Sequence, residues 1–300
     1  MKKTVINLCV AVSAFCLAAC GGGKNDSDHK DALEVIVSIP PQAELVKSVA
    51  GDKAVVTSLT TSSVNPETFE PALNALVALE NSDIYMPVGT LPFETSMVKR
   101  LDRSGNKTVV ADMSQGIKLL YGTHEHHHHD EGDDHHHSHQ HGSADPHVWS
   151  SPRNVKIMVE NIENALSKAD PDNRDFYHEN AHQLIGKIDS IDAVIKSVTD
   201  TLSCRTFVVW HPSLSYFAEE YGLKQLTVGS HGKEMSVKQL HERLDKAADE
   251  NVKVFFFQAE FDSDKASEIK NRTGARMVTI NPMNGAWDQE FKLIIDGLGK

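Results

Sequence analysis

Residues 124–141 hold the densest set of possible metal ligands in the chain. They include ten histidines mixed with Asp and Glu and lie between Gly122 and Gly142; the histidines are His124, His126, His127, His128, His129, His135, His136, His137, His139 and His141. Imidazole is the commonest metal ligand, so this tract predicts loose, overlapping sites for zinc, copper or nickel. No apolar periodicity ties it to a core, which predicts a flexible surface loop. Because acids interrupt the histidines in mid-chain, we interpret it as a native metal-scavenging loop and not as a purification tag.

Two further histidines follow the tract at separate places. His147 lies in Asp145-Pro146-His147-Val148-Trp149, and His211 comes directly after an apolar run at 206–210. Ligands in α/β sheets bind at the carboxyl ends of strands, so His211 is placed for a cleft that His147 reaches from another lobe. A lone histidine is also often a structural hydrogen-bonding residue, and position alone leaves both interpretations open.

A third pattern, H-E-x-x-H at residues 178–182, is typical of zinc hydrolases, where two histidines one helical turn apart bind the metal. The extended motif requires Gly and His where this chain has Ile185 and Ile188, and the next Glu is Glu219. We therefore interpret His178 and His182 as surface residues and expect no enzyme activity. A zinc hydrolase stays as the alternative from a different class.

The first twenty residues predict export. Lys2 and Lys3 precede an apolar run that ends in Leu17-Ala18-Ala19-Cys20, followed by three glycines. We predict a lipoprotein signal over 1–19, lipidation at Cys20, a linker over 20–32 and a lipid-anchored protein on the periplasmic side of the cell envelope. Cys204 is then the one other cysteine in the mature chain, and we expect a small buried hydrophobe. Any metal site must use histidines and carboxylates.

Length and composition describe an ordinary globular protein with room for two lobes. The 300 residues are 40% hydrophobic and 24% charged, and the net charge is −12. This acidic balance argues against nucleic acid as a partner.

Apolar β-branched runs alternate with amphipathic stretches, which predicts α/β lobes with parallel sheets. We expect strands near 33–39, 54–59, 84–88, 108–111, 206–210, 225–228, 252–257 and 277–280. Helices are expected between them, with two in the middle at 151–168 and 172–202. The simplest organisation is an N-terminal lobe over 33–170, a connecting helix over 171–202 and a C-terminal lobe over 203–300.

Taken together, several motifs resemble the zinc and manganese substrate-binding proteins of bacterial ABC importers, over roughly residues 34–298. They are 145–152 (DPHVWSSP), 170–173 (DPDN) with Tyr177 and Asn180, 211–216 (HPSLSY) and 221–223 (YGL). The histidine-rich loop is similar to that of the zinc-binding branch. The resemblance implies two βα lobes, one long rigid helix and a metal held between the lobes.

Residue by residue, the resemblance implies His147 and His211 as metal ligands. Glu67 occupies the first ligand position, where the family usually has His, and Asn281 occupies the last, where it often has an acid. A His2Glu set suits zinc, while the hard oxygen makes manganese or iron more acceptable. Glu260 or Asp262 are further candidates for the last position.

The resemblance also implies capture of Zn2+, with Mn2+ or Fe2+ as alternatives, and delivery to a membrane permease and its ATPase. We expect a monomer whose histidines bind the metal as neutral imidazoles, so that metal affinity falls at low pH. A surface adhesin or metal store without transport is a further alternative.

Overall fold

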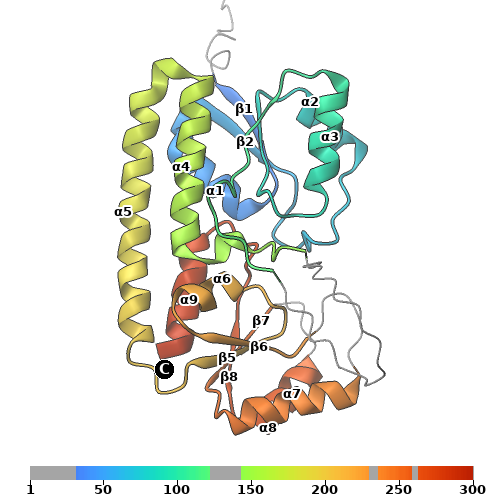
Figure 1. Ribbon diagram of the computed structural model, residues 1–300, viewed down its shortest axis with the longest axis vertical. Coiled ribbons are helices and arrows are strands. Elements are labelled where there is room, and N and C mark those ends of the chain that lie inside the picture. Colours follow the sequence, from blue (N-terminus) through green and yellow to red (C-terminus); the bar gives the residue numbers. More distant parts are fainter. Residues whose placement is uncertain (1–31, 122–142, 230–235, 259–262, 300) are drawn as a thin grey trace, which may run out of the picture. The chain divides into compact units, whose positions relative to one another are not determined.

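The N-terminal sheet has four parallel strands in the order β2-β1-β3-β4 (Figure 1). The computed structural model describes residues 32–121, 143–229, 236–258 and 263–299. In this first part the elements are β1 (Leu33–Val37), α1 (Pro40–Ala50), the 3₁₀ turn η1 (Gly51–Lys53), β2 (Ala54–Ser58), α2 (Leu73–Glu80), β3 (Ile84–Met86), α3 (Glu94–Ser104) and β4 (Val109–Val110). β1 lies between β2 and β3, with Val35 opposite both Val56 and Ile84. Its last three residues are buried, as expected for a central parallel strand.

Local signals explain where these elements end. Pro40 and Pro41 occupy the first turn of α1, where a missing N–H costs nothing, and Gly51 with φ 55° ends it. β3 stops before Pro87, which has no N–H to donate to a neighbouring strand.

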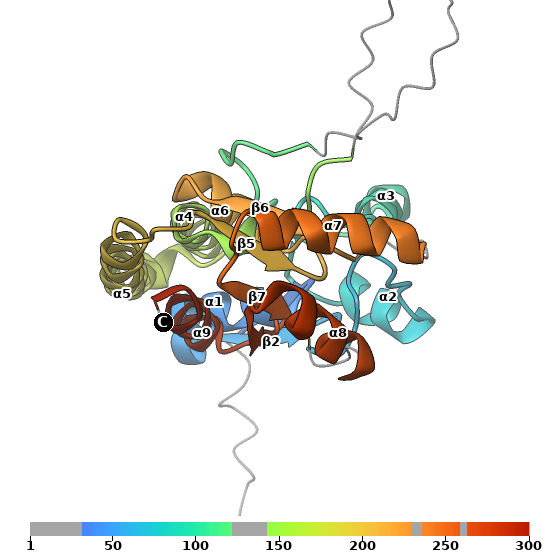
Figure 2. The same ribbon diagram turned by 90° about the horizontal axis from the view of Figure 1, so that it is seen from below.

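The second sheet repeats the same order, β6-β5-β7-β8, and is again fully parallel. Its elements are β5 (Thr206–Val209), α6 (Ser215–Glu220), β6 (Lys224–Thr227), α7 (Val237–Asp249), β7 (Val254–Phe257), α8 (Ser263–Thr273), β8 (Arg276–Thr279) and α9 (Trp287–Gly299). Alternate residues of β5 serve two cores: Val208 packs in a cluster with Leu244 of α7 and Ile269 of α8, whereas Phe207 belongs to the main core with Phe291 of α9. Figure 2 shows α7 and α8 on the side away from α5.

Two long helices lie between the two sheets in the sequence. They are α4 (Pro152–Ala169) and α5 (Arg174–Thr199), joined by the 3₁₀ turn η3 (Pro171–Asn173), and they pack side by side (Figure 1). Ser151 caps α4 by accepting a hydrogen bond from the Asn154 backbone N–H. α5 packs against α1 of the first part and α9 of the second, so a single hydrophobic cluster continues through both.

The predicted α/β fold with two parallel sheets and one long helix is confirmed. Most strands end one or two residues before the predicted apolar runs do, because the last apolar residues enter the loops that follow the strands, whereas β7 starts two residues later than its run. The expectation for Cys204 is wrong: the residue is only half-buried, and its thiol contacts the backbone oxygens of Thr206 and Glu250. Within the described ranges no helix is both long and apolar enough to cross a membrane.

Candidate metal site

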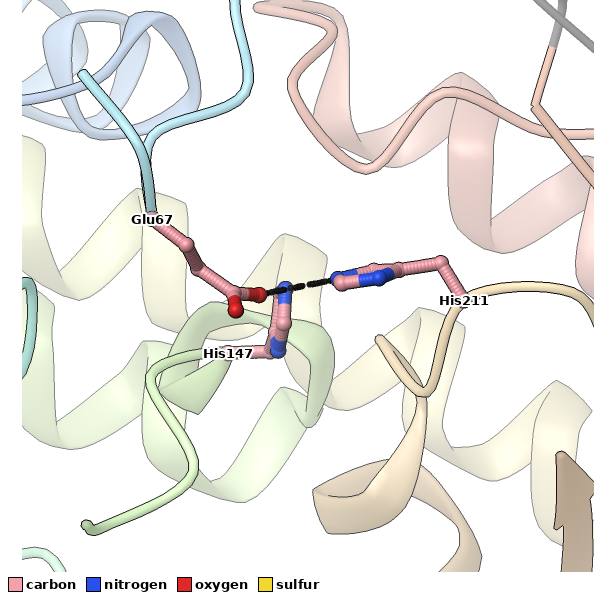
Figure 3. Close-up of side chains that lie close together, drawn as sticks. All are labelled: Glu67, His147 and His211. Carbon is pink, nitrogen blue, oxygen red and sulfur yellow. Dashed lines mark hydrogen bonds and ion pairs between the residues drawn. The ribbon is translucent and has the colours of Figure 1, made fainter. Parts of the chain in front are cut away.

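Glu67, His147 and His211 come together at one point (Figure 3). Glu67 Oε1 lies 2.9 Å from His211 Nε2 and 3.4 Å from His147 Nε2. The two Nε2 atoms are 3.2 Å apart. Among the described residues this is the one group of three or more His, Cys, Asp or Glu side chains with donor atoms so close together.

Each of the three side chains comes from a different connection in the fold. Glu67 lies in the loop between β2 and α2, where its backbone N–H donates to the Asn65 side chain. His147 directly precedes the 3₁₀ turn η2 (Val148–Ser150), which leads into α4. His211 follows β5, at the carboxyl edge of the second sheet, which is where ligands bind in α/β sheets. The loop, the turn and the sheet edge therefore converge on one small space.

Asp145 lies behind His147 and orients its imidazole ring. Its Oδ1 accepts hydrogen bonds from both the Nδ1 and the backbone N–H of His147, each at 2.9 Å. Burial by itself raises the pKa of Asp145, but the hydrogen bonds that its carboxylate accepts from His147 outweigh it, and the pKa lies below its usual value. A proton on Nδ1 leaves the Nε2 lone pair facing Glu67 and His211, as in carboxylate–histidine–zinc arrangements. From the sequence, Asp145 was named only as part of the motif 145–152 and was not assigned this hydrogen bond. Its position two residues before His147 was the signal that could have indicated it.

The distances fit a small divalent cation. Zinc binds nitrogen and oxygen at about 2.0–2.1 Å, so neighbouring ligands of a tetrahedral ion are about 3.4 Å apart. The three separations of 2.9, 3.2 and 3.4 Å approach that edge length without any large movement. A carboxylate and an imidazole lone pair directed at one point repel each other unless a cation or proton lies between them. His147 is almost fully buried, and the Glu67 and His211 side chains are about one-fifth exposed, so bound metal is partly removed from water.

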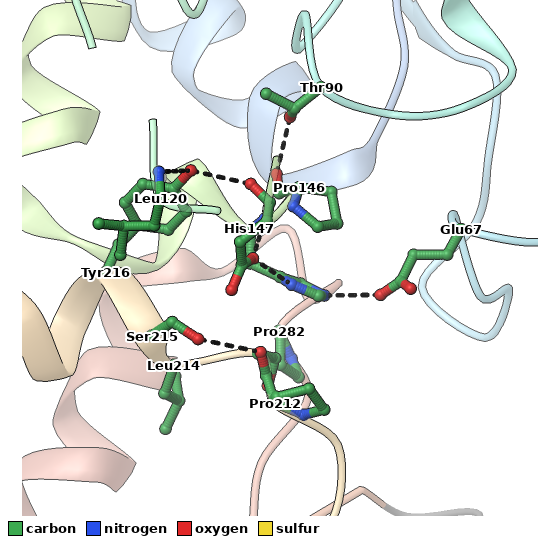
Figure 4. A network of polar contacts seen from close by, with 12 residues as sticks. Glu67, Thr90, Leu120, Pro146, His147, Pro212, Leu214, Ser215, Tyr216 and Pro282 are labelled. Carbon is green, nitrogen blue, oxygen red and sulfur yellow. Dashed lines mark hydrogen bonds and ion pairs between the residues drawn. The ribbon is translucent and has the colours of Figure 1, made fainter. Parts of the chain in front are cut away.

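A second layer of hydrogen bonds holds the His147 segment (Figure 4). The Thr90 hydroxyl donates to the Pro146 carbonyl at 2.9 Å, and the Tyr216 hydroxyl donates to the Asp145 carbonyl at 2.8 Å. The loop that carries Thr90 is held by Glu94, whose buried carboxylate accepts from the backbone N–H groups of Val88, Gly89 and Leu91. Burial raises the pKa of Glu94, against the effect of these donors and of Ser38.

Of the remaining predicted ligands, the structure describes only Asn281. Asn281 Oδ1 accepts from the Met283 backbone N–H, and its Nδ2 donates to the Ser62 carbonyl, so both side-chain atoms have protein partners. Glu260, Asp262, the histidine-rich tract at 124–141 and Cys20 lie outside the described residues.

The two histidines of the H-E-x-x-H pattern are on the exposed face of α5. His178 Nδ1 lies 2.8 Å from Glu163 Oε1 of α4, and His182 is exposed. Neither belongs to a three-donor group among the described residues. The two histidines are therefore surface residues of α5.

Comparison with known proteins shows the family of the chain. The family model described as "Zinc-uptake complex component A periplasmic" matches residues 35–294. The chain is 33% identical to the high-affinity zinc uptake system protein ZnuA of Bacillus subtilis (strain 168), over 97% of this chain and 92% of that protein. It is 25% identical to the manganese ABC transporter substrate-binding lipoprotein PsaA of Streptococcus pneumoniae serotype 4 (strain ATCC BAA-334 / TIGR4), over 81% of this chain and 79% of that protein.

The fold is similar to that of a zinc-bound crystal structure of a ZnuA deletion mutant. The TM-score is 0.76 at 28% identity, over 90% of this chain and 99% of that one. Because the family model covers most of the chain, and the Bacillus relative nearly all of it, the chain belongs to the family of the periplasmic component A of zinc-uptake complexes.

Proposed function

We propose that this protein captures one divalent cation, zinc by preference, on Glu67, His147 and His211 and delivers it to an ABC importer. The observation that carries the proposal is the convergence of three donor atoms within 3.4 Å of one another. The ion is cargo: the site binds and releases it, and no bond of a substrate is broken. Water, or one of the acids outside the described residues, completes the coordination shell.

Zinc is the first choice because two imidazoles and one carboxylate are a common zinc ligand set. Manganese or iron is the alternative, since the Glu67 oxygen is a hard ligand and a relative is named for manganese. The histidines bind as neutral imidazoles, so affinity falls as the pH is lowered and protons compete.

Export, lipid attachment at Cys20 and partnership with a permease and its ATPase are the remaining parts of the proposal. The lipoprotein signal predicted at 1–19 supports export and anchoring, and the family description supports a periplasmic role in uptake. The histidine-rich tract at 124–141 gathers zinc and passes it to the deeper site, because it lies close to His147 in sequence. Deletion of the tract should therefore slow growth under zinc limitation.

The direct test is zinc stoichiometry and affinity for the full chain and for a variant lacking 124–141, each against a competing chelator. We expect one tight zinc in both, lost when His147 and His211 are replaced by Ala. The matched control is the double replacement of His178 and His182 by Ala, which removes two exposed histidines and should leave the tight site intact. If the control variant loses tight zinc, or the tract-deleted chain has none, the site at Glu67, His147 and His211 is refuted.

Growth separates transport from storage. A deletion strain that grows as well as its parent under zinc limitation would favour a metal store or adhesin. A strain rescued by wild type, but not by the His147→Ala and His211→Ala variant, supports zinc uptake.

A further inference from the structure

The segment 281–288 follows β8, includes the first two residues of α9 and touches the first part of the chain at several points. Pro282 contributes its carbonyl oxygen, which accepts a hydrogen bond from Trp149 Nε1 at 2.8 Å. Asn281 Nδ2 donates to the Ser62 carbonyl at 3.2 Å. Ser62 lies in the loop that carries Glu67, and Trp149 lies two residues after His147. One short segment of the second part is thus bonded to the backbone of the Glu67 loop and to a side chain close to His147.

The segment is itself fixed within the second part. The Glu290 carboxylate, one turn into α9, accepts from the Asn281 backbone N–H at 2.8 Å and from Asn284 Nδ2 at 3.0 Å. At the far end, Lys187 of α5 donates to Asp288 and lies over the Trp287 ring, 5.2 Å from its centroid. Because bonds restrict both ends of the segment, the segment in turn restricts the movement of the residues that it contacts.

The Glu67 loop needs such an anchor. Most residues between 61 and 70 are exposed, and Pro66 is the buried one. Phe69 packs against Phe93 at the end of the loop, but the side chains on the Ser62 side of Glu67 are mostly exposed. Few buried apolar contacts let a loop open easily, so a hydrogen bond from a fixed segment to Ser62 restricts it. Gly285 adds a close approach: a Cβ there would meet Glu44 Cγ of α1 at 3.1 Å, so the segment lies directly against that helix.

The amide of Asn281 is required for this contact. Asn281 accepts from Met283 through Oδ1 and donates to Ser62 through Nδ2. An aspartate could make the first bond but would place an acceptor against the Ser62 carbonyl, where no bond forms. This explains why an amide fits at a position where the resemblance leads one to expect an acid.

Resting on the proposed function of the Glu67, His147 and His211 site, we propose that Asn281 is a positioning residue and not a fourth metal ligand. Together with the Trp149–Pro282 bond, its bond to Ser62 holds the Glu67 loop and the His147 turn around the metal and slows metal release.

The test is the rate of zinc release from the full chain into excess chelator, for wild type, Asn281→Ala, Asn281→Asp and Trp149→Phe. A neutral hydrogen bond of ordinary strength corresponds to a release rate about twofold to tenfold higher in each variant. The matched control is Asn180→Ala, which removes another amide-to-carbonyl bond, from α5 to Val49 of α1, and should leave release unchanged. Trp149→Phe keeps an aromatic ring and tests the second contact if Asn281→Ala folds poorly.

The visible absorption spectrum of the Co2+-loaded chain separates positioning from ligation. We expect the same Co2+ spectrum in Asn281→Ala as in wild type, because the ligands are unchanged. An altered spectrum, slower release from Asn281→Asp, or wild-type release rates in both Asn281→Ala and Trp149→Phe would overturn the inference. Absence of tight zinc from wild type itself would instead refute the proposed function.

Discussion

Replacing Asp145 by Asn tests whether the carboxylate behind His147 supports metal binding. The change keeps the shape, and Oδ1 of Asn can still accept from His147 Nδ1 and from its backbone N–H, so mainly the charge is lost. A hydrogen bond to a charged group contributes about 1.5–3 kcal/mol and a neutral one about 1 kcal/mol. The difference of about 0.5–2 kcal/mol corresponds to zinc affinity roughly 2- to 30-fold weaker.

The assay is competition between the protein and a zinc chelator at pH 7.5. Asp192→Asn is the control, because Asp192 is also buried and hydrogen-bonded, to Lys196 and Tyr221, but lies on α5. We expect the control to lose some stability and to keep wild-type zinc affinity. Zinc affinity in Asp145→Asn within twofold of wild type, or an equal loss in Asp192→Asn, would refute a specific role for the carboxylate.

Three further predictions concern stability. Glu94→Gln turns an NH2 group toward backbone N–H donors of the 88–91 loop. The free energy of unfolding should fall by about 2–4 kcal/mol in urea titrations, because buried donors lose their acceptor. An unchanged urea midpoint would contradict the buried network. Zinc at 100 times its Kd should stabilise the folded chain by about 2.7 kcal/mol, visible as a Tm rise of about 5 °C or more that the His147→Ala and His211→Ala variant lacks. Burial raises the pKa of Asp288, but the hydrogen bond and charge of Lys187 outweigh it and the folded-state pKa lies below its usual value. The stability from this pair is therefore present above the unfolded pKa and lost as pH falls through the folded pKa, and Asp288→Asn should flatten the acid limb of the unfolding free energy against pH.

The sequence by itself determined the fold class and most element positions. Period-two and apolar β-branched runs such as 33–37 and 206–209 mark buried parallel strands, and Pro40, Pro41 and Gly51 mark the ends of α1. These signals are local, because hydrogen bonding and side-chain direction within a few residues decide them. His211 was singled out by its place after the apolar run 206–210, and His147 as a residue that reaches the same cleft, but position left a structural role open for both. Glu67 came from the motif resemblance alone.

Only the tertiary structure decided which of those residues meet. His147 and His211 are 64 residues apart, yet their Nε2 atoms lie 3.2 Å apart. His178 and His182, one turn apart on α5, belong to no group of three close donors among the described residues. The structure likewise gave Asn281 protein partners and gave Asp145 its hydrogen bonds to His147. The physical reason is that metal binding depends on donor atoms converging within a few ångströms, and convergence is set by how the two sheets and their loops pack, which no short stretch of sequence specifies.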